Sequence, residues 1–379
     1  MIYFDNAATT AMSKVALKAM IDISKDKYGN ASAGYSFGRE AKKILKESRR
    51  IIAECIGAQP EEIYFTSGGT ESNNWVIGQA ELQGISQIVV SEIEHHAILR
   101  PAEKLAERTG YNVNKLPVNR DGIIITQNLS CILNNDRTLV SVMLQNNETG
   151  ILQPIKEISE IVHSKNANSI FHTDAVQSIG HKKINVKELG VDLLSASAHK
   201  FNGPKGVGFL FVRKDCSISP MILGGAQENS LRAGTENVAG IYSMAKALEE
   251  NCVLMDKHNR DILMLERVFL ETLEKEKINF TINGKDQERA VGILNVCIKG
   301  IDAEGLLNVL DTKSICISIG SACNSEKKER SHVLSAMNLE DELIDSSFRI
   351  SIGRYNTKEE VLELARNIIN YVKIFENNI

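Results

Sequence analysis

Apolar residues recur along this chain with one of two spacings, and the spacing differs between segments. Compact runs rich in β-branched and aromatic residues predict strands at 63–65, 88–92, 139–145, 168–171, 191–194 and 206–212. Apolar positions three and four residues apart predict helices at about 12–27, 39–56, 71–82 and 155–164. Strands alternating with helices in this way predict a mostly parallel sheet covered by helices on both faces.

The last third of the chain repeats this alternation in a shorter form. It opens with a long helix predicted at about 249–277, whose apolar residues lie near one face. The elements that follow are strands at 292–298, 314–319 and 348–352, and helices at 302–310 and 357–375. Because 379 residues exceed what one hydrophobic core usually organises, we expect a large domain at 12–250 and a small α/β domain made of 1–11 and 251–379.

Composition narrows the class of protein. A formal net charge of -4 provides no positive field for nucleic acid, so we expect a small-molecule substrate and no direct nucleic-acid partner. No apolar run is long enough to span a bilayer, and Asp5 comes too early for a signal peptide, so we expect a cytoplasmic protein without a membrane partner. Seven cysteines without a CxxC pair argue against a disulfide framework and against a structural zinc site.

Two polar segments follow neighbouring predicted strands, at the edge of the sheet where pockets open. They read His172-Thr-Asp-Ala-Val-Gln177 and Ser195-Ala-Ser-Ala-His-Lys200. Pyridoxal phosphate requires a lysine amine for covalent attachment, a carboxylate for its pyridinium nitrogen and donors for its phosphate. Lys200 can supply the amine, Asp174 the carboxylate, and Ser197 with His199 the phosphate donors. Considered alone, Lys200 would be interpreted as a surface lysine.

Three further motifs follow strands in the same way. In Thr66-Ser-Gly-Gly-Thr-Glu-Ser72, two glycines and a helix start form a candidate phosphate cradle, or a plain strand-to-helix connection. His95 is either a ligand of the cofactor ring or a satisfied structural histidine. Asn147, in a turn-forming sequence, is either a ligand or a capping residue.

These motifs, with Gly203-Pro-Lys-Gly-Val-Gly208, resemble the pyridoxal-phosphate core of cysteine desulfurases, which are built on the aminotransferase class V scaffold. The resemblance extends from Tyr3-Phe-Asp-Asn-Ala-Ala-Thr-Thr10 to Ser351-Ile-Gly-Arg354, nearly the whole chain. It implies an α/β, aspartate aminotransferase-like fold for pyridoxal-phosphate-dependent transferases, with a large domain and a smaller one. It also implies pyridoxal phosphate as the cofactor.

The resemblance assigns roles to single residues. It makes Gly69 and Thr70 phosphate contacts, and His95 the residue that stacks on the ring and moves protons. It gives the ring oxygen to Asn147 and Gln177, with Asn147 also near the substrate. The sequence departs from the family pattern at Ala31 and Tyr35, where proline and histidine are usual. These residues lie in the loop expected at the entrance to the site, so the resemblance does not determine the shape of that entrance.

Two further roles lie in the second half of the chain. The polar loop from Gly224 to Thr235 resembles one that crosses to a partner subunit, where Thr235 would bind the neighbour's cofactor phosphate in a homodimer. Its Ala226 replaces a common glycine. Arg354 matches the residue expected to clamp the substrate carboxylate, because a guanidinium binds carboxylate through two parallel hydrogen bonds.

Cys323 differs from the other cysteines in its surroundings. Cys55, Cys131, Cys252, Cys297 and Cys316 have largely apolar neighbours and fit buried structural thiols, whereas Cys323 follows Ser321-Ala and precedes a charged run. Lys327, Lys328 and Arg330 favour a thiolate there, and Glu326 and Glu329 oppose it. The motif resembles the long-loop branch of the family, in which this cysteine is the nucleophile.

The expected reaction is therefore conversion of L-cysteine to L-alanine, with sulfur transferred to Cys323 as a persulfide. A protein acceptor would then take the sulfur for iron–sulfur cluster assembly or thiolation. The alternatives are selenocysteine cleavage or transamination on the same cofactor, and a non-catalytic scaffold that binds sulfur-transfer partners. An NAD-dependent oxidoreductase is disfavoured, because no Gly-x-Gly-x-x-Gly follows a predicted strand.

Overall fold

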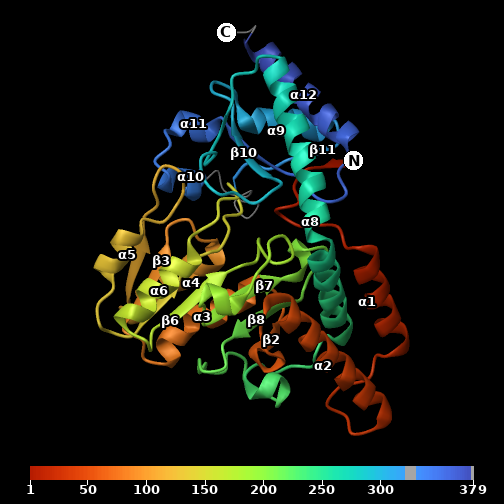
Figure 1. The fold of residues 1–379 in the computed structure, drawn as a ribbon, viewed down its shortest axis with the longest axis vertical. Coiled ribbons are helices and arrows are strands. Elements are labelled where there is room, and N and C mark those ends of the chain that lie inside the picture. The colour runs from red at the N-terminus through yellow and green to blue at the C-terminus, as the bar shows by residue number, and fades with distance from the viewer. Residues whose placement is uncertain (321–329, 377–379) are drawn as a thin grey trace.

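The computed structural model describes residues 1–320 and 330–376. A larger part contains the main sheet, and a smaller part contains both ends of the chain (Figure 1). The helices are α1 (Lys14–Asp26), α2 (Ser36–Ile56), α3 (Gly69–Leu82), α4 (His96–Thr109), α5 (Thr126–Ile132), α6 (Ile155–Lys165), α7 (Val186–Leu189), α8 (Val238–Lys275), α9 (Ala303–Thr312), α10 (His332–Ala336), α11 (Asp341–Asp345) and α12 (Lys358–Glu376).

The strands are β1 (Ile2–Tyr3), β2 (Ile63–Thr66), β3 (Gln87–Ser91), β4 (Asn112–Leu116), β5 (Thr138–Ser141), β6 (Ile170–Asp174), β7 (Leu193–Ser197), β8 (Gly208–Val212), β9 (Thr281–Ile282), β10 (Ile293–Cys297), β11 (Ile315–Cys316) and β12 (Ser347–Ser351). Seven of them form the main sheet in the order β2-β8-β7-β6-β5-β3-β4. β8 runs antiparallel to both neighbours, and the other pairs are parallel. The expected α/β fold with a mostly parallel sheet is confirmed.

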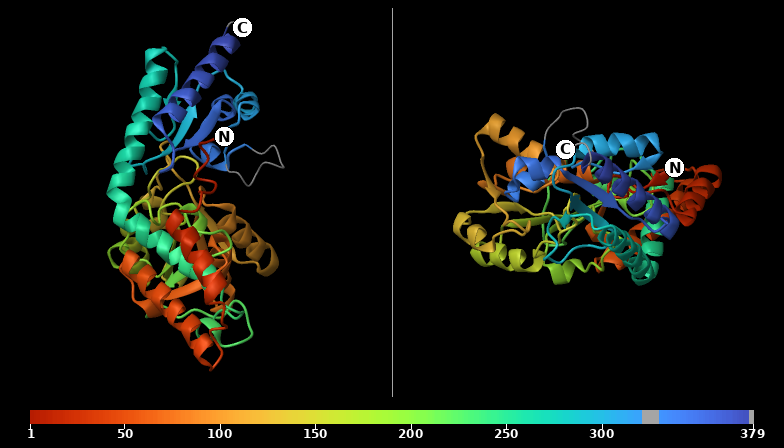
Figure 2. Two further views of the ribbon diagram at one scale, coloured as in Figure 1. Left: turned by 90° about the vertical axis from the view of Figure 1, so that its right-hand side faces the viewer. Right: turned by 90° about the horizontal axis from the view of Figure 1, so that it is seen from above.

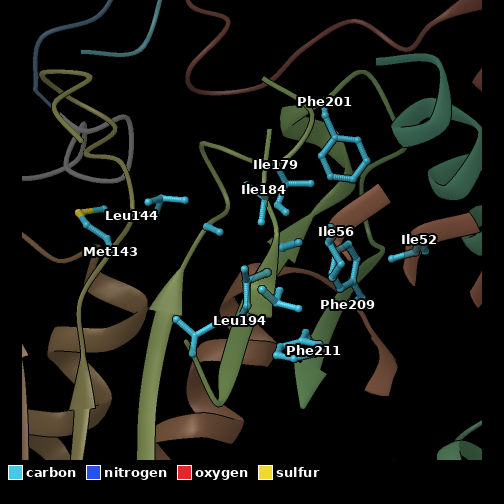
Figure 3. Packing of buried hydrophobic residues seen from close by; sticks show 14 of the residues in the cluster. Ile52, Ile56, Met143, Leu144, Ile179, Ile184, Leu194, Phe201, Phe209 and Phe211 are labelled. Atoms are coloured by element: carbon cyan, nitrogen blue, oxygen red, sulfur yellow. The ribbon is translucent and has the colours of Figure 1, made fainter. Parts of the chain in front are cut away.

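Alternate residues of the strands enter two different hydrophobic clusters, which places one cluster on each face of the sheet. On one face, Phe209 and Phe211 of β8 pack with Ile52 and Ile56 of α2 (Figure 3). On the other face, Leu210 packs in a cluster to which α3 and α4 contribute. Both faces are therefore covered, as a parallel sheet requires.

The smaller part has its own core. β12, β10 and β9 form an antiparallel sheet, and β1 pairs in parallel with β11. Apolar side chains of α8, α9 and α12 pack with these strands, among them Phe269, Leu306 and Leu364. Phe4 joins the same cluster and anchors the N-terminal segment there.

Helix α8 joins the two parts along one side of the molecule (Figure 2). Met244 and Leu248 of its first half pack in the core of the main sheet, and Ile262 and Phe269 of its second half pack in the smaller core. The domain limits at 12–250 and 251–379 stay a prediction. Residues of α10 and α11, beyond position 330, pack with the core of the main sheet.

Several predicted elements differ from the observed ones. α8 begins at Val238, eleven residues earlier than expected, where the Asn237 side chain accepts a hydrogen bond from the Gly240 amide. The predicted strand at 314–319 is reduced to β11, and β4 and α5 were not predicted. A capping box precedes α12, since Glu360 Oε2 accepts a hydrogen bond from the Thr357 amide and Thr357 Oγ1 accepts one from the Glu360 amide. No helix in the described part is long and apolar enough to cross a bilayer.

Candidate active site

A cavity of about 460 Å³ opens where the parallel strands of the main sheet end. This is the place where open α/β sheets usually bind ligands. Predicted site residues from five separate segments line it: Gly69, Thr70, His95, Asn147, Asp174, Gln177, Ser197, His199 and Lys200. The volume is typical of a site for a small molecule.

The turn between β2 and α3 forms one wall of this cavity. Gly68 has a φ of 152°, which L side chains rarely adopt, and a Cβ on Gly69 would lie 2.7 Å from Val176 Cγ2. The first turn of α3, which begins at Gly69, has backbone N–H groups without intrahelical acceptors and the positive end of the helix dipole. This wall has the donor set of a phosphate cradle.

Asp174, at the end of β6, is held by two donors. Asn73 Nδ2 donates to Asp174 Oδ2 at 2.6 Å, and the Val176 amide donates to Oδ1 at 2.9 Å. The Glu94 carboxyl lies fully buried nearby, and its burial and the charge of Asp174 raise its pKa well above the usual value. Burial therefore favours the neutral form of Glu94, and Asp174 is the carboxyl group that two donors orient in the cavity wall.

Lys200 lies one short turn beyond β7. Its Nζ donates to the carbonyl oxygens of Ala7 and Ala8 at 2.6 and 2.9 Å, so the N-terminal segment lies against the lysine. Its backbone is also fixed, because His181 Nε2 donates to the Lys200 carbonyl at 2.8 Å and Asn251 Nδ2 to that of Phe201 at 2.7 Å. No feature of the sequence predicted the contacts that Ala7 and Ala8 make with Lys200.

Both cavity histidines are neutral at pH 7. Burial, the first cause, lowers the pKa of His95, and burial with the charges of Lys200 and Lys205 lowers that of His199 to about 4. The Ala97 amide donates to His95 Nδ1 at 3.0 Å, so the proton of the neutral ring is on Nε2. A neutral imidazole can stack on a ring and exchange a proton.

This donor set fits pyridoxal phosphate. A lysine amine, an oriented carboxylate and a helix N-terminal cradle line one cavity, as that cofactor requires.

Arg354 and Thr235 lie outside the lining of this cavity. Arg354 lines a smaller cavity of about 50 Å³ that shares Lys200 with the first, and its Nη2 is 2.8 Å from Glu250 Oε2. Thr235 lines a pocket of about 160 Å³, which shares Ser67 and Gly206 with the main cavity. Cys323 lies outside the described residues.

Arg349 was missed in the sequence and lines the main cavity. Its side chain is 1% exposed, forms an ion pair with Asp5 at 2.5 Å and donates to the Asn147 carbonyl at 2.9 Å. The signal that could have revealed it is a charged residue inside a strand, between the buried Phe348 and Ile350.

The loop that ends at Thr235 is fixed within its own chain. Glu228 is buried, pairs with Arg49 at 2.6 Å and accepts from the Phe65 amide at 2.9 Å. Arg232 pairs with Glu71 at 2.8 Å, at the edge of the main cavity. Ala226 has a φ of -83°, which alanine adopts without strain, so the loop accepts this residue in place of glycine.

The family model for aminotransferase class-V matches residues 2–364. The chain is 44% identical to the cysteine desulfurase IscS of Dictyoglomus turgidum over 378 residues, 98% of this chain and 95% of the relative. It is similar to a solved NifS-like protein, with a TM-score of 0.92, 34% identity and coverage of 98% and 99% of the two chains. It is also similar to SspA in complex with cysteine, with a TM-score of 0.83, 31% identity and coverage of 94% and 100%. The chain therefore belongs to the aminotransferase class-V family.

Proposed function

We propose that the chain is a cysteine desulfurase that uses pyridoxal phosphate to convert L-cysteine to L-alanine. The observation that carries this proposal is one cavity lined by Lys200, Asp174 and the turn at Gly69 and Thr70, in a chain closely related to cysteine desulfurases. A relative with 31% identity has been solved in complex with cysteine, which supports cysteine as the substrate.

The cofactor, when bound, supplies a sink for the electron pair left as the substrate Cα loses its proton. Lys200 would hold the cofactor covalently and then move that proton. Asp174, kept in place by Asn73, would bind the pyridinium nitrogen. The α3 turn with Ser197 and His199 would hold the phosphate.

Three other side chains would bind the cofactor ring. Asn147 and Gln177 line the cavity and would bind the ring oxygen, and the Gln177 side chain is fixed by its hydrogen bond to the Ala7 carbonyl at 2.9 Å. His95, neutral at pH 7, would stack on the ring and exchange protons near the substrate.

For the substrate carboxylate, we favour Arg349 over Arg354. Arg349 lines the cavity that contains the cradle and the lysine, whereas Arg354 lines the smaller cavity and is bonded to Glu250. A planar guanidinium on the main cavity wall is suited to a carboxylate.

Cys323 would be the sulfur acceptor within the chain. Its sulfur forms a bond to the substrate sulfur as the substrate Cβ–Sγ bond breaks. The thiol protons supply the hydrogen that Cβ gains, so the products are L-alanine and a Cys323 persulfide. Neither an oxidant nor a reductant is needed.

Replacing Cys323 by serine tests this assignment. The variant should bind pyridoxal phosphate normally, since the cavity is intact, but L-alanine formation from L-cysteine should fall to the level of a control without enzyme. Alanine is measured by chromatography, and the persulfide is located by mass spectrometry. Cys131→Ser, which removes an exposed thiol, is the control and should keep the parent rate. A persulfide on a cysteine other than Cys323 would contradict the assignment.

We also propose a homodimer in which Thr235 of each subunit binds the phosphate in the other. This rests on the resemblance of the loop and on its position, since its pocket shares Ser67 and Gly206 with the main cavity. The loop is anchored by Glu228 and Arg232, so its course is defined before any partner binds.

Mixed dimers test whether Thr235 acts across the interface. Lys200→Ala and Thr235→Ala chains are unfolded together, refolded and assayed. If Thr235 acts on the partner's site, each heterodimer has one intact site. Random pairing makes about half of the dimers heterodimers, so the mixture should contain on average about half an intact site per dimer. Activity no higher than in the unmixed parents would show that Thr235 acts within its own chain.

The acceptor of the persulfide sulfur would be a protein. Its transfer would serve iron–sulfur cluster assembly or a thiolation pathway, in agreement with the IscS relatives. A cytoplasmic location is part of the same proposal and rests on the sequence pattern.

A further inference from the structure

The N-terminal segment, residues 5–10, contacts both the arginine and the lysine of the main cavity. Asp5 forms an ion pair with Arg349, and two residues later the Ala7 carbonyl accepts a hydrogen bond from Lys200. Among the described residues, Asp5 provides the only carboxylate that pairs with this arginine. It is therefore the charged group that can set the position of the guanidinium.

The backbone of Asp5 is fixed to the strand that carries Arg349. Asp5 forms a parallel bridge with Ser351, two residues after Arg349 on β12. The Ser351 amide donates to the Phe4 carbonyl at 2.7 Å, and Ser351 Oγ accepts from the Ala7 amide at 2.9 Å. Phe4 is fully buried in the core of the smaller part. This main-chain pairing therefore determines where the Asp5 carboxylate meets the guanidinium.

The guanidinium retains donors after these contacts are made. Arg349 Nη2 donates to Asp5 Oδ1, and Nη1 donates to the Asn147 carbonyl. The Nε atom is buried and has no hydrogen-bond partner among the described residues. An arginine has five N–H groups, so two of them hold this guanidinium in place and the others can bind a ligand. A buried donor without a partner is rare in folded proteins, which indicates a ligand at this position.

We propose that Asp5 is a positioning residue, which holds the Arg349 guanidinium so that the cavity selects amines that carry a carboxylate. This inference rests on the assignment of Arg349 to the substrate carboxylate in the proposed function. Asp5 and a substrate carboxylate have the same charge, so the charge of Asp5 alone would weaken substrate binding. Its contribution is the orientation of the planar fork, which must present two parallel donors to the carboxylate.

The test compares two ligands that differ only in the carboxylate, L-alanine and ethylamine. Their dissociation constants are measured from the change in cofactor absorbance of the cofactor-loaded Cys323→Ser protein, so no sulfur transfer is required. The ratio of the two constants gives the selectivity for the carboxylate and cancels any change that weakens both ligands alike. In Asp5→Ala this selectivity should fall by about 10- to 100-fold, because misplacement of a positioning group costs up to about that factor. An unchanged or increased selectivity would overturn the proposal.

Two further variants separate the position of the arginine from the charge beside it. Asp5→Asn removes the charge but keeps an acceptor oxygen in place, so the selectivity should stay within about threefold of the parent. Asp5→Glu keeps the charge but is longer by one methylene, so it displaces the guanidinium and the selectivity should fall. This variant also decides the matter if the Asp5→Ala protein does not fold. The opposite order of the two variants would show that charge acts in place of orientation, and would overturn the proposal.

Glu266→Ala is the matched control for the loss of a buried ion pair. Glu266 is a buried acid that pairs with Arg289, and neither residue lines the main cavity. The control should lower the melting midpoint and leave the selectivity for the carboxylate unchanged. A fall in selectivity as large as that of Asp5→Ala would show that the effect is only structural.

Arg349→Lys distinguishes a failure of this inference from a failure of the assignment on which it rests. If Arg349→Lys keeps the parental selectivity, the arginine does not bind the carboxylate, and both the assignment and the role of Asp5 are wrong. If Arg349→Lys lowers the selectivity and Asp5→Ala does not, only the role of Asp5 is wrong. We expect both variants to lower it.

Discussion

Lys200→Ala protein will fold but will not hold pyridoxal phosphate covalently. Lys200 is one of two lysines among the described residues that line the cavity, and its Nζ is fixed there by the Ala7 and Ala8 carbonyls. Reduction with borohydride followed by peptide mapping should find the cofactor on Lys200 in the parent and on no lysine in the variant. L-Alanine formation should also fall by about 10²–10⁴-fold, the usual contribution of a positioned acid–base group.

Lys205→Ala is the matched control, since Lys205 lines the same cavity five residues later. It is exposed, and it follows the buried Pro204 in a loop rather than a strand end. The cofactor adduct on Lys200 should survive in this variant. A reducible adduct on Lys205 in the Lys200→Ala protein would show that the amine was assigned to the wrong residue.

Arg349→Lys should raise the KM for L-cysteine strongly, and Arg354→Lys should raise it much less. Lysine keeps the positive charge but loses the planar fork, so any bidentate contact with the substrate carboxylate is lost. Loss of such a buried, charged contact costs about 2–5 kcal/mol, so kcat/KM should fall at least about 30-fold for Arg349→Lys. The measurement is steady-state alanine formation over a range of L-cysteine concentrations.

Each arginine variant also needs a test of folding, because Arg349 pairs with Asp5 and Arg354 with Glu250. Cofactor absorbance and melting midpoint supply it. A larger rise in KM for Arg354→Lys, in a protein that retains its cofactor, would restore the assignment made from the sequence.

The positions of Arg349 and Arg354 relative to the cavity could not be predicted from the sequence alone. Arg349 lies inside the predicted strand at 348–352 and Arg354 follows that strand, but the motif match drew attention to Arg354 alone and did not show which of the two borders the cavity. That depended on the strand's orientation: β12 pairs with β10, and Arg349, fully buried, comes within 2.5 Å of Asp5, which is 344 residues away. Distances of this kind are set by packing between remote segments and leave no local trace.

The direction of β8 is a second case. Its apolar run, Gly208–Val212, was predicted as a strand, but the pattern of a strand buried on both faces is the same for either direction. Only the connection from β7 through the short turn at Lys200 decides that β8 returns antiparallel. The same turn brings Lys200 to the N-terminal segment.

The sequence by itself determined six of the seven strands of the main sheet, the glycine turn before α3 and the polar segments that contain Asp174 and Lys200. Helix and strand periodicity, glycine at a positive φ and polar residues at strand ends are local properties, and local physics favours them wherever they occur. Tertiary structure alone decided that Arg349 lines the cavity and that the Ala7 and Ala8 carbonyls accept hydrogen bonds from the lysine amine. Each of these contacts joins segments far apart in the chain, so it exists only once the hydrophobic faces of sheet and helices have packed together.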